Sequence, residues 1–172
     1  LNEHTTPEEV EALMKLFDDG RDVGLITEAG LPAVADPGAQ LVRLCHRHGV
    51  EVVPMSGPSS LMLALMASGL NGQSFAFLGY LPAKTEERRQ ALRSIEKHSS
   101  TARQTKIFIE TPYRNDSLLA DILSVCRADT EVCIAANITM PDAFIRTKTA
   151  GEWKKSVPKI GKRPCVFLIL GH

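Results

Sequence analysis

The sequence is poor in aromatic residues, which make up 5% of its 172 residues, and it has a single tryptophan. No run of about 18 apolar residues occurs, so no membrane-spanning helix is predicted. The polar opening residues show no basic-then-apolar signal peptide. Glycine and proline, 12 and 10 residues, are scattered along the chain, which excludes collagen-like and low-complexity proteins. With 44% hydrophobic residues, the chain is expected to fold around a sizeable core.

Cysteine and histidine are also sparse, and their spacing does not suit a metal site. The cysteines are Cys45, Cys126, Cys133 and Cys165, and no two of them form a C-x-x-C pair. His46 and His48 stand two apart, which on a helix turns the rings away from each other. We therefore predict no metal and expect reduced, buried thiols in a cytoplasmic protein.

The net charge is zero overall, but the charged residues are unevenly distributed along the chain. Residues 1–73 hold four Lys or Arg against ten Asp or Glu, whereas residues 74–172 hold sixteen against ten. The sign changes at a polar, turn-prone stretch, residues 71–74. We therefore expect two lobes, 1–73 and 74–172, of which the basic second one suits a polyanion or simply has solvated helix faces.

The apolar pattern of the first lobe alternates between helical and strand-like stretches. Helices are expected from Pro7, over about 36–49 and over 58–69, and strands over 22–27 and 50–54. Such alternation predicts an α/β lobe with a parallel sheet.

In the second lobe some strands follow one another without a long helix between them, which predicts a mixed sheet. The expected strands are 75–78, 106–110, 131–137, 142–148 and 165–170. The expected helices are 85–98, 113–127 and a short one near 152–154, with residues 99–101 as a linker.

Loops of small and polar residues follow three of these strands. Residues 26–38 and 53–60 are rich in Gly, Pro, Ala and Ser, which let a ligand approach the backbone closely. Neither contains a G-x-G-x-x-G or P-loop pattern, so dinucleotide and triphosphate sites are not supported. The third loop brings together Glu110, Tyr113 and Arg114. Arg114 can grip an anion or pair with Glu110, and all three loops can equally be plain strand–helix connections.

The order and spacing of four motifs resemble the tetrapyrrole methylase superfamily, and within it the ribosomal RNA small-subunit methyltransferase I family. These motifs are residues 27–38, 54–60, 79–84 and 110–114. The resemblance implies two α/β lobes with S-adenosylmethionine (SAM) bound between them. It also implies a homodimer that 2′-O-methylates a cytidine of 16S ribosomal RNA.

The resemblance assigns the cofactor contacts, whereas the base and substrate candidates follow from residue type and position. Expected cofactor contacts are Gly30, Leu31, Pro32, Val34, Ser59, Ser60, Thr111, Ala136, Asn137, Pro164 and Cys165. Candidates for the general base are Glu28, Glu110 and Tyr113, because each stands at or near a strand end. Candidates for substrate contacts are Lys84, Arg88 and Arg114.

Three departures from the family pattern keep other functions open. The family's opening strand is missing, so the chain is expected to be truncated at its start. Residues 136–139 replace an Arg-Glu pair, and Lys162-Arg163-Pro164 replaces Lys-Gly-Glu. The alternatives are a methyltransferase acting on a tetrapyrrole or other small molecule, and a non-catalytic SAM-binding domain.

Overall fold

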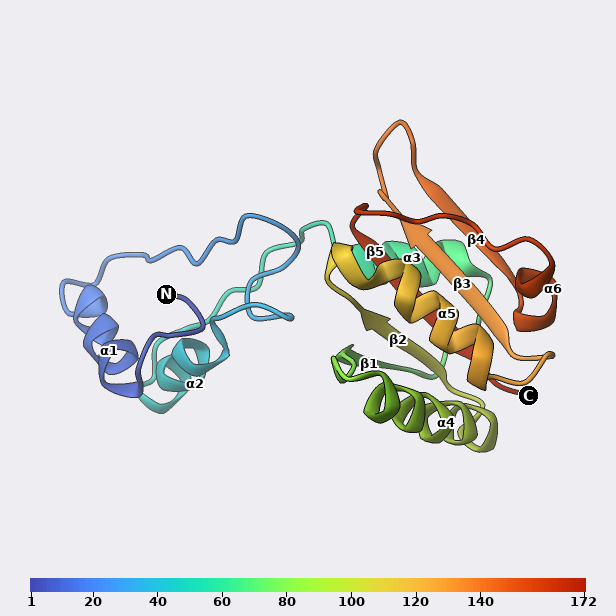
Figure 1. The fold of residues 1–172 in the computed structure, drawn as a ribbon. Coiled ribbons are helices and arrows are strands. Elements are labelled where there is room, and N and C mark those ends of the chain that lie inside the picture. Colours follow the sequence, from blue (N-terminus) through green and yellow to red (C-terminus); the bar gives the residue numbers. More distant parts are fainter. The chain divides into compact units, whose positions relative to one another are not determined.

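The computed structural model describes residues 1–172, which divide into two compact units, Leu1–Ser59 and Ser60–His172 (Figure 1). This division lies earlier in the chain than the expected lobe boundary at residues 71–74. Helix α3 (Ser60–Ser68) explains the difference. Its residues Leu61, Ala64 and Leu65 pack with apolar side chains of the second unit's sheet.

The second unit is built on one five-stranded mixed sheet, as its sequence predicts. Its strands are β1 (Phe75–Tyr80), β2 (Thr105–Ile109), β3 (Glu131–Ala136), β4 (Phe144–Thr149) and β5 (Cys165–Leu170). They lie in the order β1-β2-β5-β3-β4. Only β1 and β2 are parallel, and the other three pairs are antiparallel.

Helices cover both faces of this sheet. Leu61, Ala64 and Leu65 of α3 pack on the face that carries Ile107 and Leu168. Helices α4 (Thr85–Ala102), α5 (Asn115–Val125) and α6 (Ala150–Lys155) cover the face that carries Phe108 and Phe167 (Figure 1). Neighbouring strand residues therefore face opposite layers, as the two-residue period of a strand requires.

Trp153 is part of this core. Its side chain is buried, and Nε1 donates a hydrogen bond to the carbonyl oxygen of Val132 at 2.9 Å. A buried indole with a satisfied N–H cannot stack on a nucleobase. Trp153 therefore has a packing role.

The helices follow the sequence prediction closely, with one correction. Residues 99–101 are not a linker, because α4 continues to Ala102 and ends at Arg103 in the left-handed conformation. The Ser99 hydroxyl donates to the Gln104 carbonyl and the Thr101 hydroxyl to the Lys97 carbonyl, so these polar side chains bond within and around the helix. Among all helices, none has the length and apolar character needed to cross a bilayer.

The first unit contains two of the three helices expected before residue 70, and the third is α3 of the second unit. Helix α1 (Pro7–Ala12) begins with a capping box in which Thr6 and Glu9 bond each other's backbone amides. The 3₁₀ turn η1 (Leu13–Phe17) continues it, and α2 (Ala39–Arg47) packs against both. Their shared core is small, with Val10, Leu41 and Cys45 as its buried residues.

The parallel sheet expected in the first unit is not present. Residues 22–27 and 50–54 run without strand hydrogen bonds, and Ile26 and Val53 are 89% and 70% exposed. An isolated strand is not stable, because its backbone groups need a paired neighbour. The two segments do not pair with each other, so the prediction of a sheet in the first unit is wrong.

Candidate functional site

In the first unit, two of the predicted ligand loops lie against each other. A Cβ atom built on Gly57 would stand 3.1 Å from Cδ2 of Leu31. Gly38, which ends the first loop at a φ of 142°, has Leu25 and Ala33 so close that a side chain does not fit. Gly38 and Gly57 are therefore the positions where these loops approach other side chains closely. The loop that carries the predicted cofactor residues of the first motif therefore lies beside the loop that carries Ser59. Those residues are Gly30, Leu31, Pro32 and Val34.

Left-handed backbone is concentrated in the candidate loops. Five residues other than glycine have a positive φ. Ala33 and Ala35 lie in the first candidate loop, and Asn137 and Thr139 lie in the loop after β3, which begins with a predicted cofactor residue. The fifth, Arg103, only ends a helix. Such conformations cost free energy and persist where the surroundings hold them, often at ligand sites.

In the second unit, the sheet brings the other predicted cofactor residues to one edge. Ala136 pairs with Cys165, and one residue further in, Ala135 and Ile109 both pair with Val166. Thr111 follows the end of β2 and Asn137 the end of β3, while Pro164 precedes β5. The amide of Asn137 donates to the Pro164 carbonyl at 2.9 Å. The sequence prediction thus selected residues that are neighbours in space.

Glu110 is buried at this edge and engaged with its neighbours. Its Oε1 atom accepts hydrogen bonds from the Thr111 amide at 2.7 Å and from Arg114 Nη2 at 2.8 Å. Burial opposes ionisation of Glu110, but the bonds and the charge of Arg114 outweigh it and hold its pKa below the ordinary value. The Glu110–Arg114 pair therefore fixes the loop after β2, and Arg114 is only partly free for a substrate.

Three buried polar atoms, two of this pair and one of the next residue, have no hydrogen-bond partner. They are Glu110 Oε2, Arg114 Nε and Asn115 Oδ1. Buried polar groups are almost always bonded, and unbonded ones are found where a water or ligand group binds. This cluster supports the location of the site at the carboxyl end of β2.

The other two candidate bases are in open positions. Tyr113 lies in the 3₁₀ turn η2 (Pro112–Arg114) and is 80% exposed. Glu28 is exposed in the first unit and makes no ion pair. Either side chain can therefore reach a ligand in solution.

The basic residues predicted to contact substrate differ in availability. Lys84 is exposed and pairs with Glu87 at 3.1 Å. Arg88, in contrast, is buried, and its guanidinium bonds Asp121 and the Ala83 carbonyl. A guanidinium held this way joins α4 to α5, so the structure does not support Arg88 as a phosphate contact.

Sequence reasoning missed Asn115 and Asp116, which hold the loop before β5. Asn115 Nδ2 donates to the carbonyl oxygens of Gly161 and Arg163, at 3.0 and 2.7 Å. Asp116 Oδ1 accepts from the Ile160 amide at 2.8 Å. The available signal was an Asn-Asp pair at a helix start, where side chains commonly bond nearby backbone.

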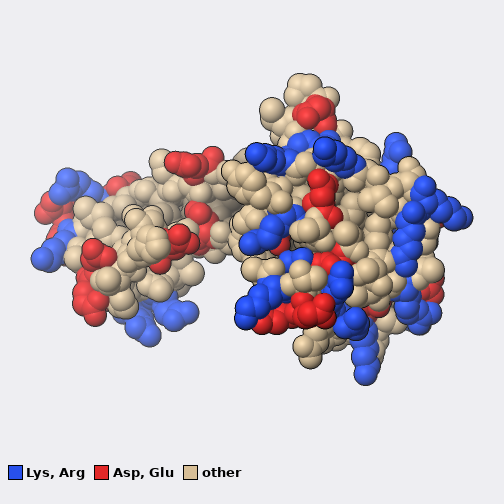
Figure 2. All heavy atoms as spheres, viewed as in Figure 1, with Lys and Arg blue, Asp and Glu red and all other residues tan.

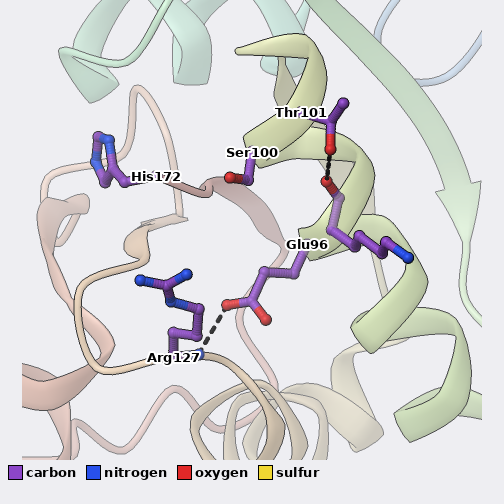
Figure 3. A pocket seen from close by; sticks show the side chains of 6 residues that line it. Glu96, Ser100, Thr101, Arg127 and His172 are labelled. Atoms are coloured by element: carbon purple, nitrogen blue, oxygen red, sulfur yellow. Dashed lines mark hydrogen bonds between the residues drawn. The ribbon is translucent and has the colours of Figure 1, made fainter.

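A hollow in the surface lies elsewhere. It measures about 210 Å³ and is lined by Glu96, Ser100, Arg127 and His172, among others (Figure 3). His172 follows β5 at its far end, whereas Cys165 begins it, so this hollow lies across the sheet from the candidate site. In Figure 3 the backbone amide of Arg127 donates a hydrogen bond to the Glu96 carboxylate. This carboxylate therefore holds the backbone after α5 in place.

The residues at the sheet edge fit a nucleoside ligand. SAM has no phosphate, so its site needs small side chains and few polar groups. Asn137 uses Nδ2 on Asp142, at 2.8 Å, and its Oδ1 remains able to accept a hydrogen bond. Burial raises the pKa of the Cys165 thiol to about 12, so it stays protonated and acts as an apolar side chain.

Two relatives show how far the similarity extends. The chain is 34% identical over 175 residues to the ribosomal RNA small subunit methyltransferase I of Escherichia coli O157:H7, covering 100% of this chain and 60% of that protein. It is 39% identical over 175 residues to the protein of the same name from Vibrio cholerae serotype O1, covering 100% and 59%. The chain thus spans about three fifths of the length of these relatives.

Solved structures share the fold at low identity. The methyltransferase CobJ matches with a TM-score of 0.63 at 17% identity, covering 96% of this chain and 71% of that one. A uroporphyrin-III C-methyl transferase from Thermus thermophilus, complexed with S-adenyl homocysteine, matches at 0.54 and 18%, covering 97% and 74%. The model of the tetrapyrrole (corrin/porphyrin) methylases matches residues 1–154. The chain therefore belongs to the tetrapyrrole methylase family.

Proposed function

We propose that this chain is part of a SAM-dependent methyltransferase that modifies the 2′-oxygen of a cytidine in 16S ribosomal RNA. The observation that carries this is the identity of 34 to 39% with two proteins named ribosomal RNA small subunit methyltransferase I. The excess of basic residues after residue 74 supports a polyanionic substrate over a small molecule.

The chain's own residues would act mainly by positioning. When bound, SAM supplies a methyl group on a positively charged sulfur. Because the sulfur becomes a neutral thioether on transfer, it is already a good leaving group. Within the second unit, the sheet edge around Thr111 and Asn137 would hold the nucleoside. Glu110 fixes the Thr111 amide and Arg114, and this use of its carboxylate disfavours it as the base.

Glu28 is our choice for the group that accepts the ribose proton. Its carboxylate is exposed and without an ion pair, so it is available to a hydroxyl that loses its proton during transfer. We expect Glu28→Gln to lower kcat by about 10²-fold with little change in SAM affinity. An unchanged kcat would exclude this role.

The function is tested with the full-length gene product and purified small ribosomal subunits from a strain that lacks the gene. We expect transfer of a labelled methyl group to 16S RNA and one missing 2′-O-methyl cytidine in the mutant strain's RNA, measured by mass spectrometry. An unchanged set of methylated nucleosides would exclude the RNA substrate and favour the tetrapyrrole or small-molecule alternative.

Calorimetry with SAM and S-adenosylhomocysteine tests the cofactor separately. Heat of binding with micromolar affinity is expected, and its absence would favour a domain without methyltransferase activity. The homodimer and the cytoplasmic location implied by the family resemblance remain predictions. Sedimentation of the full-length protein measures the first, and cell fractionation measures the second.

A further inference from the structure

We propose that Tyr113 and the cations of the loop before β5 form a surface that binds the single-stranded RNA substrate, with the Tyr113 ring stacking on a base. This inference rests on the proposed function and names the RNA contact surface of the same site. We call the surface the basic ledge and define it by Tyr113, Arg146, Lys162 and Arg163.

An exposed aromatic ring and a lysine lie together at the centre of the ledge. The Lys162 ammonium stands 5.1 Å from the centre of the Tyr113 ring, and Tyr113 is 80% exposed. One face of a ring covered by a cation leaves the other for a base. Aromatic side chains beside a basic groove are the usual means of binding single-stranded RNA.

Two arginines continue the ledge away from Tyr113. The guanidinium carbons of Arg146 and Arg163 lie 5.8 and 5.9 Å from the centre of the Phe144 ring. Both guanidiniums therefore stand at the same phenyl ring. Arg163 and Lys162 are consecutive residues, so the ledge carries cations from β4 to Tyr113, and cations are the groups that bind a phosphate backbone.

The ledge is held in place before any substrate binds. Asn115 bonds the carbonyl oxygens of Gly161 and Arg163, and Asp116 bonds the amides of Ile160 and Gly161. The Arg163 Nε atom also donates to the Ile160 carbonyl at 2.8 Å. Because the loop is already ordered, RNA binding loses little conformational entropy there.

The ledge also adjoins the candidate cofactor residues and keeps its positive charge. Tyr113 is two residues beyond Thr111, and Lys162 is two residues before Pro164. The acidic neighbours are Glu110, paired with Arg114, Asp116, bonded to backbone amides, and Asp142, bonded to Asn137. Figure 2 shows lysine and arginine side chains at several places on the visible face of the second unit, with acidic side chains among them.

Binding of a short cytidine-containing RNA to the full-length protein, saturated with S-adenosylhomocysteine, tests the ledge by fluorescence anisotropy. Tyr113→Ala is expected to raise Kd about tenfold, and Tyr113→Phe to leave it within about twofold, because stacking needs the ring and not the hydroxyl. Lys162→Ala is expected to lower the slope of log Kd against log salt by about 0.7. Lys97→Ala, on an exposed face of α4 next to the far hollow, is the matched control and should bind as the wild type does.

The outcomes separate the ledge from the function it serves. Wild-type methylation of small subunits combined with unchanged RNA binding by Tyr113→Ala and Lys162→Ala would overturn the ledge and leave the function standing. A loss of rate in Tyr113→Phe with normal RNA affinity would make the phenol a proton acceptor instead and also overturn the stacking role. A wild-type protein that binds SAM but no RNA would overturn both.

Discussion

At the scale of single residues, the Glu110–Arg114 pair decides between two roles that sequence alone leaves open. An arginine four residues after a carboxylate can bind a substrate anion or pair internally. The Glu110 side chain is fully buried, and Arg114 Nη2 bonds it at 2.8 Å. Removing a buried charge from its partner is costly, so this pair is expected to stay formed with or without substrate.

This pair predicts a specific dependence of stability on acid. Since the folded pKa of Glu110 lies below its ordinary value of 4.5, its ionisation stabilises the fold above pH 4.5. That contribution is lost as the pH falls through the lowered pKa. We expect Glu110→Gln to lower the free energy of unfolding at pH 7 by about 1–2 kcal/mol and to flatten its decline below pH 4.5.

Urea unfolding between pH 3 and pH 7 measures this effect. Glu86→Gln is the control, because the Glu86 side chain is 86% exposed and its ion pair with Arg89 is long, at 3.6 Å. Parallel pH profiles for the wild type and Glu110→Gln would show that Glu110 ionises equally in the folded and unfolded protein, against our interpretation.

Backbone strain at Thr139 gives a second prediction at this scale. Thr139 has a φ of 73°, which is unusual for a β-branched residue because its side chain crowds the backbone. Thr139→Gly removes that crowding and is expected to raise stability by about 1 kcal/mol, while Thr139→Asn gains less. Thermal unfolding compares the three proteins, and a lower midpoint for Thr139→Gly would mean that the threonine side chain contributes contacts that outweigh the strain.

At the scale of elements, sequence patterns predicted what local chemistry determines. The strand over 165–170 is found at those residues, and α1 begins at Pro7 as predicted. The prediction of a strand over 22–27 was wrong, because a strand depends on a partner that its own residues do not specify. The same limit hid the clamp made by Asn115, since its partner Gly161 is 46 residues away.

The contact between α4 and α5 yields a prediction of element packing. Arg88 and Arg89 of α4 both bond Asp121 of α5, and the side chains of Arg88 and Asp121 are each only 4% exposed. Asp121→Ala leaves the Arg88 charge buried and unpaired, so we expect a loss of about 3–5 kcal/mol in the free energy of unfolding.

Two further variants make this prediction specific. Replacing both partners by apolar residues, as Arg88→Met with Asp121→Leu, is expected to recover most of the lost stability. Arg89→Ala, at a side chain that is 38% exposed, should cost less than about 1 kcal/mol. Denaturant unfolding measures all three, and equal losses for Asp121→Ala and Arg89→Ala would contradict the assigned role of the buried pair.

At the scale of the whole molecule, the candidate site was predictable in parts. The motif resemblance selected residues that the second unit brings to one sheet edge, because strand ends with small residues are readable locally. Arg88 was misplaced because a basic helix face looks alike in sequence whether it meets solvent or a buried Asp121. The basic ledge was missed because it joins Tyr113 to Lys162, which are far apart in the chain.

The unequal build of the two units leads to a last prediction, for the 172-residue chain itself. The first unit has three buried core residues, and its segments 22–27 and 50–54 lack strand hydrogen bonds, whereas helices cover both faces of the sheet in the second unit. Backbone that is exposed and unpaired opens easily to a protease. Brief digestion with a protease of broad specificity should therefore cut within residues 21–29 and 51–58 first and leave a fragment that begins near Ser60. S-adenosylhomocysteine should slow both cuts if the loops at Gly30 and Ser59 bind it, and mass spectrometry of the fragments reads both effects. First cuts inside β2 or β5 would show that the second unit is the weaker one.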